Sequence, residues 1–405
     1  MSNAPLLSWT EAGASRTARW RSEATVPPPP RVVIGDDTLA ADTAFRLASE
    51  GTAILWRGDF HNARQLLQAL VRRLDRSRTK PRKSAQQSKH PATPSDAFHR
   101  HRLTQSQRAR TLGRLLIPFD ADYVIPLRRA PDVRLACTEV YGEHSPPFVA
   151  SLRELLGLIG AHEWRKNGLP IAALGGARIY PHYGVFAPVR GEYLELVAQA
   201  PLPAMSPQSL AFDIGTGTGV LAALLAQRGV TQIIATDQDP RALTCARENI
   251  EQLGLTPQVS IEPQHLFPPG RAPLIVCNPP WVPARPSAPL EQAIFDPDSQ
   301  MLRGFLAGLA DHLTPGGEGW LILSDLAEHL GLRSRADLLA LIDTAGLRVL
   351  DRLDARPHHP KVADDSDPLH AARAAEITSL WRLAARQAAN PYNPALAEGR
   401  CSDPH

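Results

Sequence analysis

The stretch Ser209–Asp237, SLAFDIGTGTGVLAALLAQRGVTQIIATD, decides the fold of this 405-residue chain. It opens with an apolar run typical of a buried strand and continues into the helical pattern of VLAALLAQRG. It then returns to a strand pattern in TQIIATD. Strand, helix and strand in this order predict two parallel strands joined by a covering helix.

The same alternation continues to about residue 355. The segment GWLILSD, for example, has a strand pattern and is followed by the helical pattern of SRADLLALIDTAG. Helices of this length between strands predict an α/β fold with a doubly wound, Rossmann-like parallel sheet. We assign it to residues 171–385 and expect its ligand at the carboxyl ends of the strands. RIYPHYGVFAP, near the start of this region, alternates like a strand or hairpin edge.

A glycine-rich turn lies between the first strand and helix of this domain. Its alternating glycines permit a sharp turn and the close approach of a ligand, and the following helix would direct N–H groups at that ligand. Asp237 ends the next strand and suits the two hydroxyl groups of a ribose. The G-x-G-x-G spacing led by an acid favours a nucleoside with a compact zwitterionic tail over a dinucleotide; a tight turn without a ligand is the alternative. The predicted cofactor residues of the turn are Asp213, Gly215, Thr216, Gly217, Thr218 and Gly219.

A second motif, Asn278-Pro279-Pro280-Trp281, follows the strand pattern LIVC. The prolines remove two N–H donors, so this corner presents the side-chain oxygen of Asn278 and backbone carbonyl groups. Converging acceptors suit a planar NH2 group, and Trp281 offers a face for stacking. We predict all four residues to be catalytic; a simple proline-rich turn is the alternative.

Together the two motifs predict methyl transfer. A sulfonium methyl group is already electrophilic, whereas an amide or aromatic NH2 nitrogen is a poor nucleophile because its lone pair is delocalised. Orientation of that nitrogen is therefore the main contribution expected from the protein.

D-I-G-T-G-T-G, A-T-D and N-P-P-W together resemble the class I S-adenosylmethionine-dependent methyltransferases, in particular the HemK-like, methyltransferase small-domain branch. The resemblance implies S-adenosyl-L-methionine as cofactor, its methionine part along the glycine loop and its ribose at Asp237. It implies that Asn278 lies between cofactor and acceptor and that Gly184–Pro188 closes over the cofactor. His265-Leu266 replaces the acid that usually binds the adenine amino group, so His265 or a backbone group is expected to substitute. Trp281 replaces the more usual tyrosine.

The N-terminal part is predicted to be a smaller, mixed α+β domain for substrate recognition, over residues 31–170. Residues 1–30 are predicted to be a flexible N-terminus and residues 386–405 a tail. Residues 78–97 are rich in Lys, Pro, Gln and Ser, which predicts a disordered basic loop. Segment 72–114 holds 13 Lys and Arg against two acids, so its charge of +11 leaves −8 for the rest of a chain with net charge +3. Such a segment favours nucleic-acid binding, a solvated linker being the alternative.

We therefore expect an N-methyltransferase acting on a planar NH2 nitrogen of a macromolecular acceptor. The first choice is a glutamine side chain in a protein of the translation apparatus, and the alternative is the adenine amino group of RNA or DNA. An inactive methyltransferase fold that binds nucleic acid and a small-molecule N-methyltransferase are further possibilities. The four cysteines lack metal-site spacing, no run of 18 apolar residues exists, and no signal-peptide pattern opens the chain. We accordingly expect no metal, no membrane contact and a cytoplasmic location.

Overall fold

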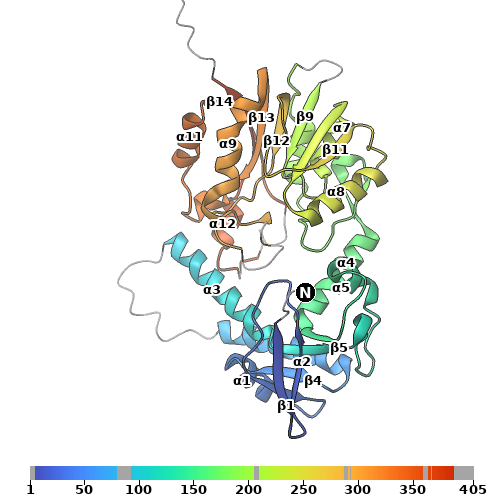
Figure 1. The fold of residues 1–405 in the computed structure, drawn as a ribbon. Helices are drawn as coiled ribbons and strands as arrows, with labels where there is room; N and C mark the ends of the chain where they lie inside the picture. Colours follow the sequence, from blue (N-terminus) through green and yellow to red (C-terminus); the bar gives the residue numbers. More distant parts are fainter. Residues whose placement is uncertain are drawn as a thin grey trace, which may run out of the picture.

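The computed structural model describes residues 5–79, 93–204, 209–286, 291, 293–358, 364–365 and 367–386. They form an N-terminal and a C-terminal domain (Figure 1). The strands of the N-terminal domain are β1 (Leu6–Glu11), β2 (Ala14–Trp20), β3 (Val32–Gly35), β4 (Ala53–Trp56), β5 (Leu115–Phe119) and β6 (Phe148–Ser151). Its helices are α1 (Ala41–Ser49), α2 (Phe60–Thr79), α3 (Pro94–Leu112), α4 (Arg134–Tyr141) and α5 (Leu152–Asn167).

The N-terminal strands form one mixed sheet in the order β1-β2-β6-β5-β4-β3. Strands β3, β4 and β5 run parallel, whereas β6 is antiparallel to β5. One face packs against helices through a core that includes Ile54, Leu70 and Leu155. The other face carries a smaller core with Leu7, Leu55 and Trp20, which the β1–β2 hairpin helps to cover.

Two predictions for this region are wrong. Residues 6–20 are not a flexible terminus but the β1–β2 hairpin, whose Leu7 is fully buried and whose Trp20 donates its indole N–H to Val26. Residues 94–97 are not loop but the first turn of α3, because Thr93 and Asp96 form a reciprocal capping box. Residues 78–79 are likewise not loop but the last residues of α2. Segments 80–92 and 387–405, which hold most of the predicted loop and most of the predicted tail, lie outside the described residues.

The C-terminal domain is built on a seven-stranded sheet in the order β11-β10-β9-β12-β13-β15-β14. All neighbours are parallel except β15, which is antiparallel to both β13 and β14. The chain leaves β9 for β10 on one side and later returns to place β12 on the other, so the topological switch point lies between β9 and β12. Its strands are β9 (Leu210–Ile214), β10 (Gln232–Asp237), β11 (Val259–Pro263), β12 (Ala272–Cys277), β13 (Leu313–Ser324), β14 (Leu347–Ala355) and β15 (Thr378–Ala385).

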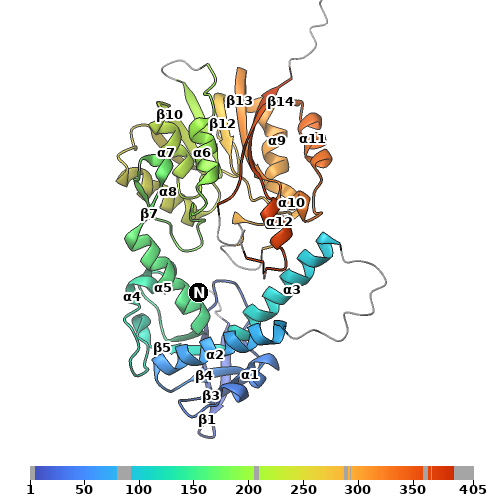
Figure 2. The same cartoon turned by 180° about the vertical axis from the view of Figure 1, so that it is seen from behind.

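Helices cover both faces of this sheet (Figure 2), which confirms the predicted doubly wound α/β class. One core joins the sheet to α6 and α7, and the other joins it to α9 and α11. The helices are α6 (Glu192–Gln199), α7 (Val220–Gln227), α8 (Pro240–Gln252), α9 (Gln300–His312), α10 (Leu326–His329), α11 (Arg335–Thr344) and α12 (His370–Ala375). None of the helices in the described ranges is long and apolar enough to cross a membrane.

The segment RIYPHYGVFAP departs from its predicted strand. Only its first two residues pair, as β8 (Arg178–Ile179) against β7 (Leu169–Pro170). The remainder, including Gly184–Pro188, has no strand structure and runs to α6. The strand pattern fails because Asn249 of α8, rather than a neighbouring strand, accepts the backbone N–H of Tyr180.

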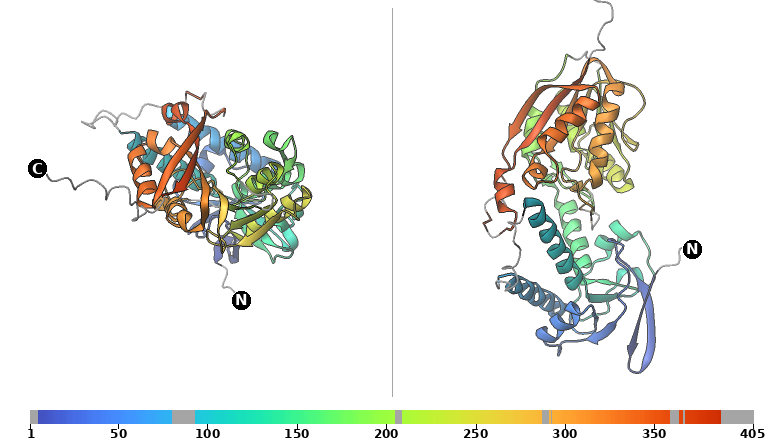
Figure 3. Two further views of the ribbon diagram at one scale, coloured as in Figure 1. Left: turned by 90° about the horizontal axis from the view of Figure 1, so that it is seen from above. Right: turned by 90° about the vertical axis from the view of Figure 1, so that its left-hand side faces the viewer.

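The N-terminal domain lies below the carboxyl-end edge of the C-terminal sheet, and α3 and α5 both reach up towards it (Figure 3). Ion pairs connect the two domains at this edge. Arg102 of α3 pairs with Glu291 at 3.1 Å, and Arg165 of α5 pairs with Glu248 of α8 at 2.8 Å. Glu23 pairs with Arg241 of α8 at 2.6 Å. The predicted ligand edge therefore faces the N-terminal domain.

Candidate active site

The loop after β9 needs its glycines for three different reasons. Gly215, Gly217 and Gly219 have φ values of 72°, 56° and 81°, which side-chain-bearing residues rarely adopt. A Cβ on Gly215 would overlap the methyl group of Met301, and one on Gly219 would lie 3.4 Å from Ala246 of α8. A Cβ on Gly217 would meet no atom within 4 Å, so this glycine opens onto free space.

The backbone N–H groups of this loop are used mainly within the protein. Those of Gly215 and Thr216 donate to the carbonyl of Thr236 at 2.9 and 2.8 Å. The N–H of Gly217 donates to the carboxylate of Asp237 at 3.0 Å. The loop is thereby tied to the end of the neighbouring strand β10, which gives it a fixed shape before any ligand binds.

Asp213 is fully buried at the end of β9. Its Oδ2 accepts the hydroxyl of Thr216 at 2.6 Å and the N–H of Ala222 at 3.1 Å, whereas its Oδ1 is buried and has no partner among the described residues. Burial raises the pKa of this carboxyl group to about 7, although the bonds from Thr216 and Ala222 oppose the shift. A buried carboxylate with one oxygen to spare is suited to a cationic ligand group.

Asp237 lies beside the loop at the end of β10. Its two oxygens accept the N–H groups of Gly217 at 3.0 Å and of Asp239 at 2.9 Å. Burial raises the pKa of this carboxyl group, while the backbone donors lower it. The backbone bonds fix the orientation of the carboxylate at the sheet edge.

Asn278 lies on the other side of the same loop. In the register of the sheet, Cys277 pairs with Ile214 on β9, and Thr236 pairs with Ile214 from β10. Asp237 and Asn278, the next residues of the two strands, therefore flank Gly215. The structure thus brings the two sequence motifs together at the switch point. Cys277 itself is fully buried in the core.

The acceptor motif is braced by contacts within itself. Trp281 donates its indole N–H to Oδ1 of Asn278 at 2.8 Å, so one of the two lone pairs on that oxygen is already engaged. The guanidinium of Arg190 lies 5.1 Å from the centre of the Trp281 ring. Pro279 is buried, and Pro280 and Trp281 are half-buried. Stacking of an acceptor on Trp281 stays a prediction.

His265 and Leu266 follow β11 and lie close to the end of β10. The ring of His265 is exposed, with Nδ1 2.9 Å from Oε1 of Gln238. The carbonyl of Leu266 accepts the hydroxyl of Thr236 at 2.7 Å. Both residues therefore neighbour Asp237, and their predicted contact with a nucleobase stays a prediction.

Sequence reasoning missed several residues that shape this site. Asn249 of α8 is fully buried and donates to the carbonyl of Thr218 at 3.0 Å while accepting the N–H of Tyr180 at 2.8 Å. It thus holds the segment before α6 against the glycine loop. Nothing in the sequence marks this asparagine, because a polar residue in a helical pattern is ordinarily exposed.

Asp296 was also missed. Its carboxylate accepts the N–H groups of Met301 at 3.1 Å and Leu302 at 3.2 Å, at the start of α9. It thereby orients Met301, whose methyl group lies behind Gly215. An Asp-Pro pair ahead of a helical pattern is a capping signal that could have identified it.

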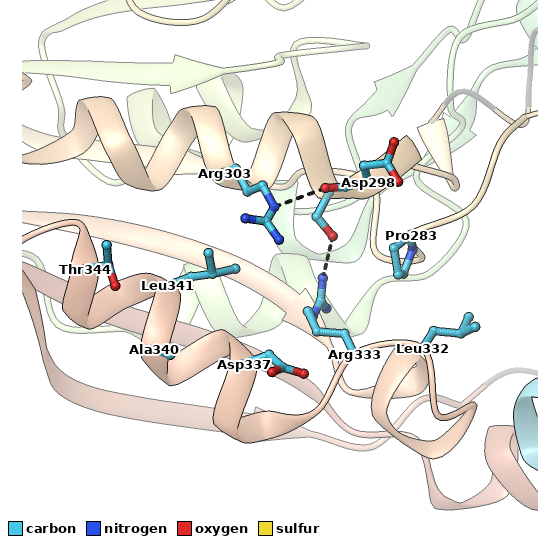
Figure 4. Close-up of a pocket in the computed structure, with 10 residues that line it drawn as sticks. Pro283, Asp298, Arg303, Leu332, Arg333, Asp337, Ala340, Leu341 and Thr344 are labelled. Atoms are coloured by element: carbon cyan, nitrogen blue, oxygen red, sulfur yellow. Dashed lines mark hydrogen bonds between the residues drawn. The ribbon is translucent and has the colours of Figure 1, made fainter.

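Arg333 supports the acceptor motif from behind. It is 8% exposed, with Nη2 3.5 Å from the carbonyl oxygen of Trp281 and Nη1 3.5 Å from Oγ of Ser299. It lines a cavity of about 510 Å³ between α9 and α11, beside Pro283 (Figure 4). Burial lowers the pKa of Arg333. The motif is therefore held from the outer face of the sheet as well as from its edge.

Comparisons with known proteins concern the same region. Residues 179–335 match the family model described as "Methyltransferase small domain". A release factor glutamine methyltransferase of Cereibacter sphaeroides is 33% identical over 167 residues, which cover 37% of this chain and 58% of that protein. A ribosomal protein L11 methyltransferase of Sorangium cellulosum is 28% identical over 236 residues, covering 53% and 67%. A tRNA1(Val) (adenine(37)-N6)-methyltransferase of Vibrio campbellii is 38% identical over 84 residues, covering 18% and 33%.

The sheet topology and the family match together define the C-terminal domain as a class I S-adenosylmethionine-dependent methyltransferase domain of the HemK-like branch. The chain spans little more than half the length of the first relative named above. S-adenosyl-L-methionine is the cofactor of this class of domain.

The residues present fit that cofactor. Oδ1 of Asp213, which has no partner among the described residues, suits the ammonium group of the cofactor. The open space at Gly217 lets the cofactor approach the backbone of the loop, and the carboxylate of Asp237 suits the hydroxyl groups of the ribose. Among the described residues, no group of three or more His, Cys, Asp and Glu side chains could hold a metal ion.

Proposed function

We propose that this protein is an S-adenosylmethionine-dependent N-methyltransferase that modifies the side-chain amide of a glutamine in a protein acceptor. The observation that carries the proposal is the position of Asn278, which flanks Gly215 at the switch point opposite Asp237. The side chain of Asn278 thus lies beside the cofactor loop, at the edge of the sheet that faces the N-terminal domain.

The acceptor motif suits a planar NH2 group. Pro279 and Pro280 have no N–H, so they bring carbonyl oxygens without donors to this corner. The indole of Trp281 takes one lone pair of the Asn278 side-chain oxygen and leaves the other for the substrate. In the proposal that lone pair and a motif carbonyl receive the two hydrogens of the NH2 group, which turns the nitrogen lone pair out of conjugation.

The cofactor, when bound, supplies an electrophilic methyl group on a neutral leaving sulfur. The protein has to orient the nitrogen, and orientation can contribute roughly 7–11 kcal/mol to a barrier of this kind. Hydrogen bonds that strengthen as the nitrogen becomes positive add about 3 kcal/mol for each well-placed acceptor. No side chain is needed to remove the proton before attack.

Glutamine is favoured over other acceptors by the relatives. Three of the relatives, including that of Cereibacter sphaeroides, carry the name release factor glutamine methyltransferase. By this proposal the acceptor is a protein of the translation apparatus, which would place the enzyme in the cytoplasm.

A second candidate is methylation of the adenine amino group in RNA or DNA. Two observations favour it: the charge of +11 over residues 72–114 and the similarity to a tRNA adenine methyltransferase over 84 residues. Helix α3 carries part of this charge to the segment that follows the acceptor motif, where Arg102 pairs with Glu291.

The test is to incubate the purified protein with methyl-labelled S-adenosylmethionine and a cell lysate, and to digest the products separately with protease and nuclease. The glutamine proposal expects label that is lost only with protease, and a glutamine residue 14 mass units heavier in the labelled peptide. Asn278→Ala serves as the inactive control. Label that is lost with nuclease would contradict glutamine as the acceptor and support the adenine amino group instead. Tight cofactor binding without any transfer would leave an inactive binding protein.

A further inference from the structure

Arg190 and Trp281 form a contact that the sequence motifs do not include. Arg190 lies in the segment before α6, and its guanidinium is 5.1 Å from the centre of the Trp281 ring. A cation over an indole face is attracted to the ring electrostatically. The contact therefore links the segment that precedes the domain's first helix to the acceptor motif.

Two buried carboxylates fix the position of Arg190. Its Nε donates to Glu192 at 2.7 Å and its Nη2 donates to Glu376 at 3.0 Å. These carboxylate side chains are 6% and 3% exposed, so the guanidinium is held in low-dielectric surroundings where such bonds are strong. Glu376 is itself oriented by the hydroxyl of Ser324 at 2.6 Å. Because two hydrogen bonds fix the guanidinium of Arg190, its contact with the indole restricts the position of the Trp281 ring.

The ring in turn determines which atom of Asn278 faces the substrate. An asparagine amide has nearly the same shape in its two flipped orientations, and its hydrogen-bond partners decide between them. The indole N–H of Trp281 can only donate, so it selects the orientation with Oδ1 towards it, at 2.8 Å. In the opposite orientation the NH2 group of Asn278 would face the NH2 group of the acceptor, and donor would oppose donor.

We propose that Arg190 is a positioning residue, which holds the Trp281 ring in place and through it keeps Oδ1 of Asn278 available to the acceptor NH2 group. This inference rests on the proposed function, because it assigns Arg190 a part in that reaction. Arg190 touches neither reacting group in this proposal. Its effect on turnover passes through the indole.

The test compares Arg190→Gln, Arg190→Lys and Trp281→Phe with a matched control, Arg335→Gln. Arg335 makes the same kind of contact elsewhere in the domain, since its guanidinium is 5.2 Å from the Trp381 ring and pairs with Glu328 at 2.7 Å. The readouts are kcat, the cofactor Kd measured by calorimetry, and the indole N–H resonance of Trp281 in protein labelled with 15N-tryptophan.

Arg190→Gln is expected to lower kcat about tenfold, as the loss of a cation–ring contact of ordinary strength would do. The cofactor Kd should stay within about twofold, and the Trp281 resonance should move. Arg190→Lys should recover part of the loss, and Arg335→Gln should change none of the three. In the Trp281→Phe background, Arg190→Gln should have little further effect on kcat, because the ring N–H through which it acts is gone.

Unchanged kcat and an unmoved Trp281 resonance in Arg190→Gln would overturn the proposal. The proposal would also fail if Arg190→Gln lowered kcat by the same factor in the native protein and in the Trp281→Phe background. Such additive losses would indicate a general structural role for Arg190. The resonance needs no acceptor. If the native protein transfers no methyl group but the resonance still responds to Arg190, the proposed function fails while the link between Arg190 and Trp281 stands.

Discussion

The backbone N–H of Gly217 donates to the carboxylate of Asp237 across 3.0 Å. This one bond joins the loop after β9 to the end of β10, so the two predicted cofactor elements form a single unit. Gly217 keeps the loop open, because nothing lies within 4 Å of where its Cβ would be. Asp237 keeps the loop in place. The two residues should respond differently to substitution.

Gly217→Ala should weaken cofactor binding at least tenfold, because a methyl group would enter the space assigned to the cofactor. The matched control is Gly254→Ala, since Gly254 also has positive φ, at 70°, and open space around it. Each change should cost about 1–2 kcal/mol of stability, as placing a side chain in left-handed backbone does. Calorimetry and urea unfolding measure the two effects. Equal cofactor affinity in both variants would remove Gly217 from the site.

Asp237→Ala should weaken cofactor binding about 10–100-fold, because hydrogen bonds to a charged group contribute about 1.5–3 kcal/mol each. Asp239→Ala is the control: Asp239 is a neighbouring carboxylate that caps α8 by accepting the N–H of Arg241 at 2.9 Å. Its loss should cost about 1 kcal/mol of stability and leave the cofactor Kd unchanged. A Kd for Asp237→Ala equal to that of the native protein would contradict the ribose assignment.

Asn278→Ala should abolish measurable turnover while the cofactor Kd stays within about tenfold, since this side chain acts mainly in the transition state. Single-turnover methylation and calorimetry separate the two quantities. Trp281→Phe should fall between the native protein and Asn278→Ala, because it removes only the bond to Oδ1. A parallel loss of cofactor binding and turnover in Asn278→Ala would place the asparagine on the cofactor instead.

The glycine turn, the alternation of strands and helices around it and the N-P-P-W corner were predictable because each follows from local chemistry. Alternating glycines require positive φ, and the apolar runs around them require buried parallel strands. Since parallel strands end at one edge, the alternation predicts Asp237 and Asn278 at the same edge. Their proximity also requires β10 and β12 to lie on the two sides of β9. Strand β15 was not predicted as an element, although it joins β13 to the edge strand β14.

The rest depended on contacts between distant residues. Leu7 and Trp20 are buried because they pack against strands that come much later in the chain. The local sequence does not show this contact, so the hairpin was predicted as a flexible terminus. The contact between Arg190 and Trp281 depends on Glu376, which lies nearly two hundred residues further along the chain and accepts a hydrogen bond from Arg190. The bond between Trp281 and Asn278 was likewise not expected, although the two residues are only three positions apart.

The last prediction concerns pH. Burial raises the pKa of Asp213 to about 7 in the folded chain, from an ordinary value of 3.8. The folded state therefore holds more protons than the unfolded state between about pH 4 and pH 7. Stability must then fall as the pH rises through that interval. The loss should be of the order of 1–4 kcal/mol and should be complete above pH 7.

Asp213→Asn removes this penalty, so without cofactor the gain in stability of the variant over the native protein should be larger at pH 8 than at pH 5. Urea unfolding at the two pH values measures the difference. The control is Asp36→Asn, because Asp36 is exposed and its bonds to Thr38 lower its pKa. That variant should show no gain at pH 8. Saturating S-adenosylmethionine should reverse the order at pH 8, because only a carboxylate at position 213 can pair with an ammonium group. A variant that gains equally at both pH values would show that the buried charge of Asp213 is not the cause.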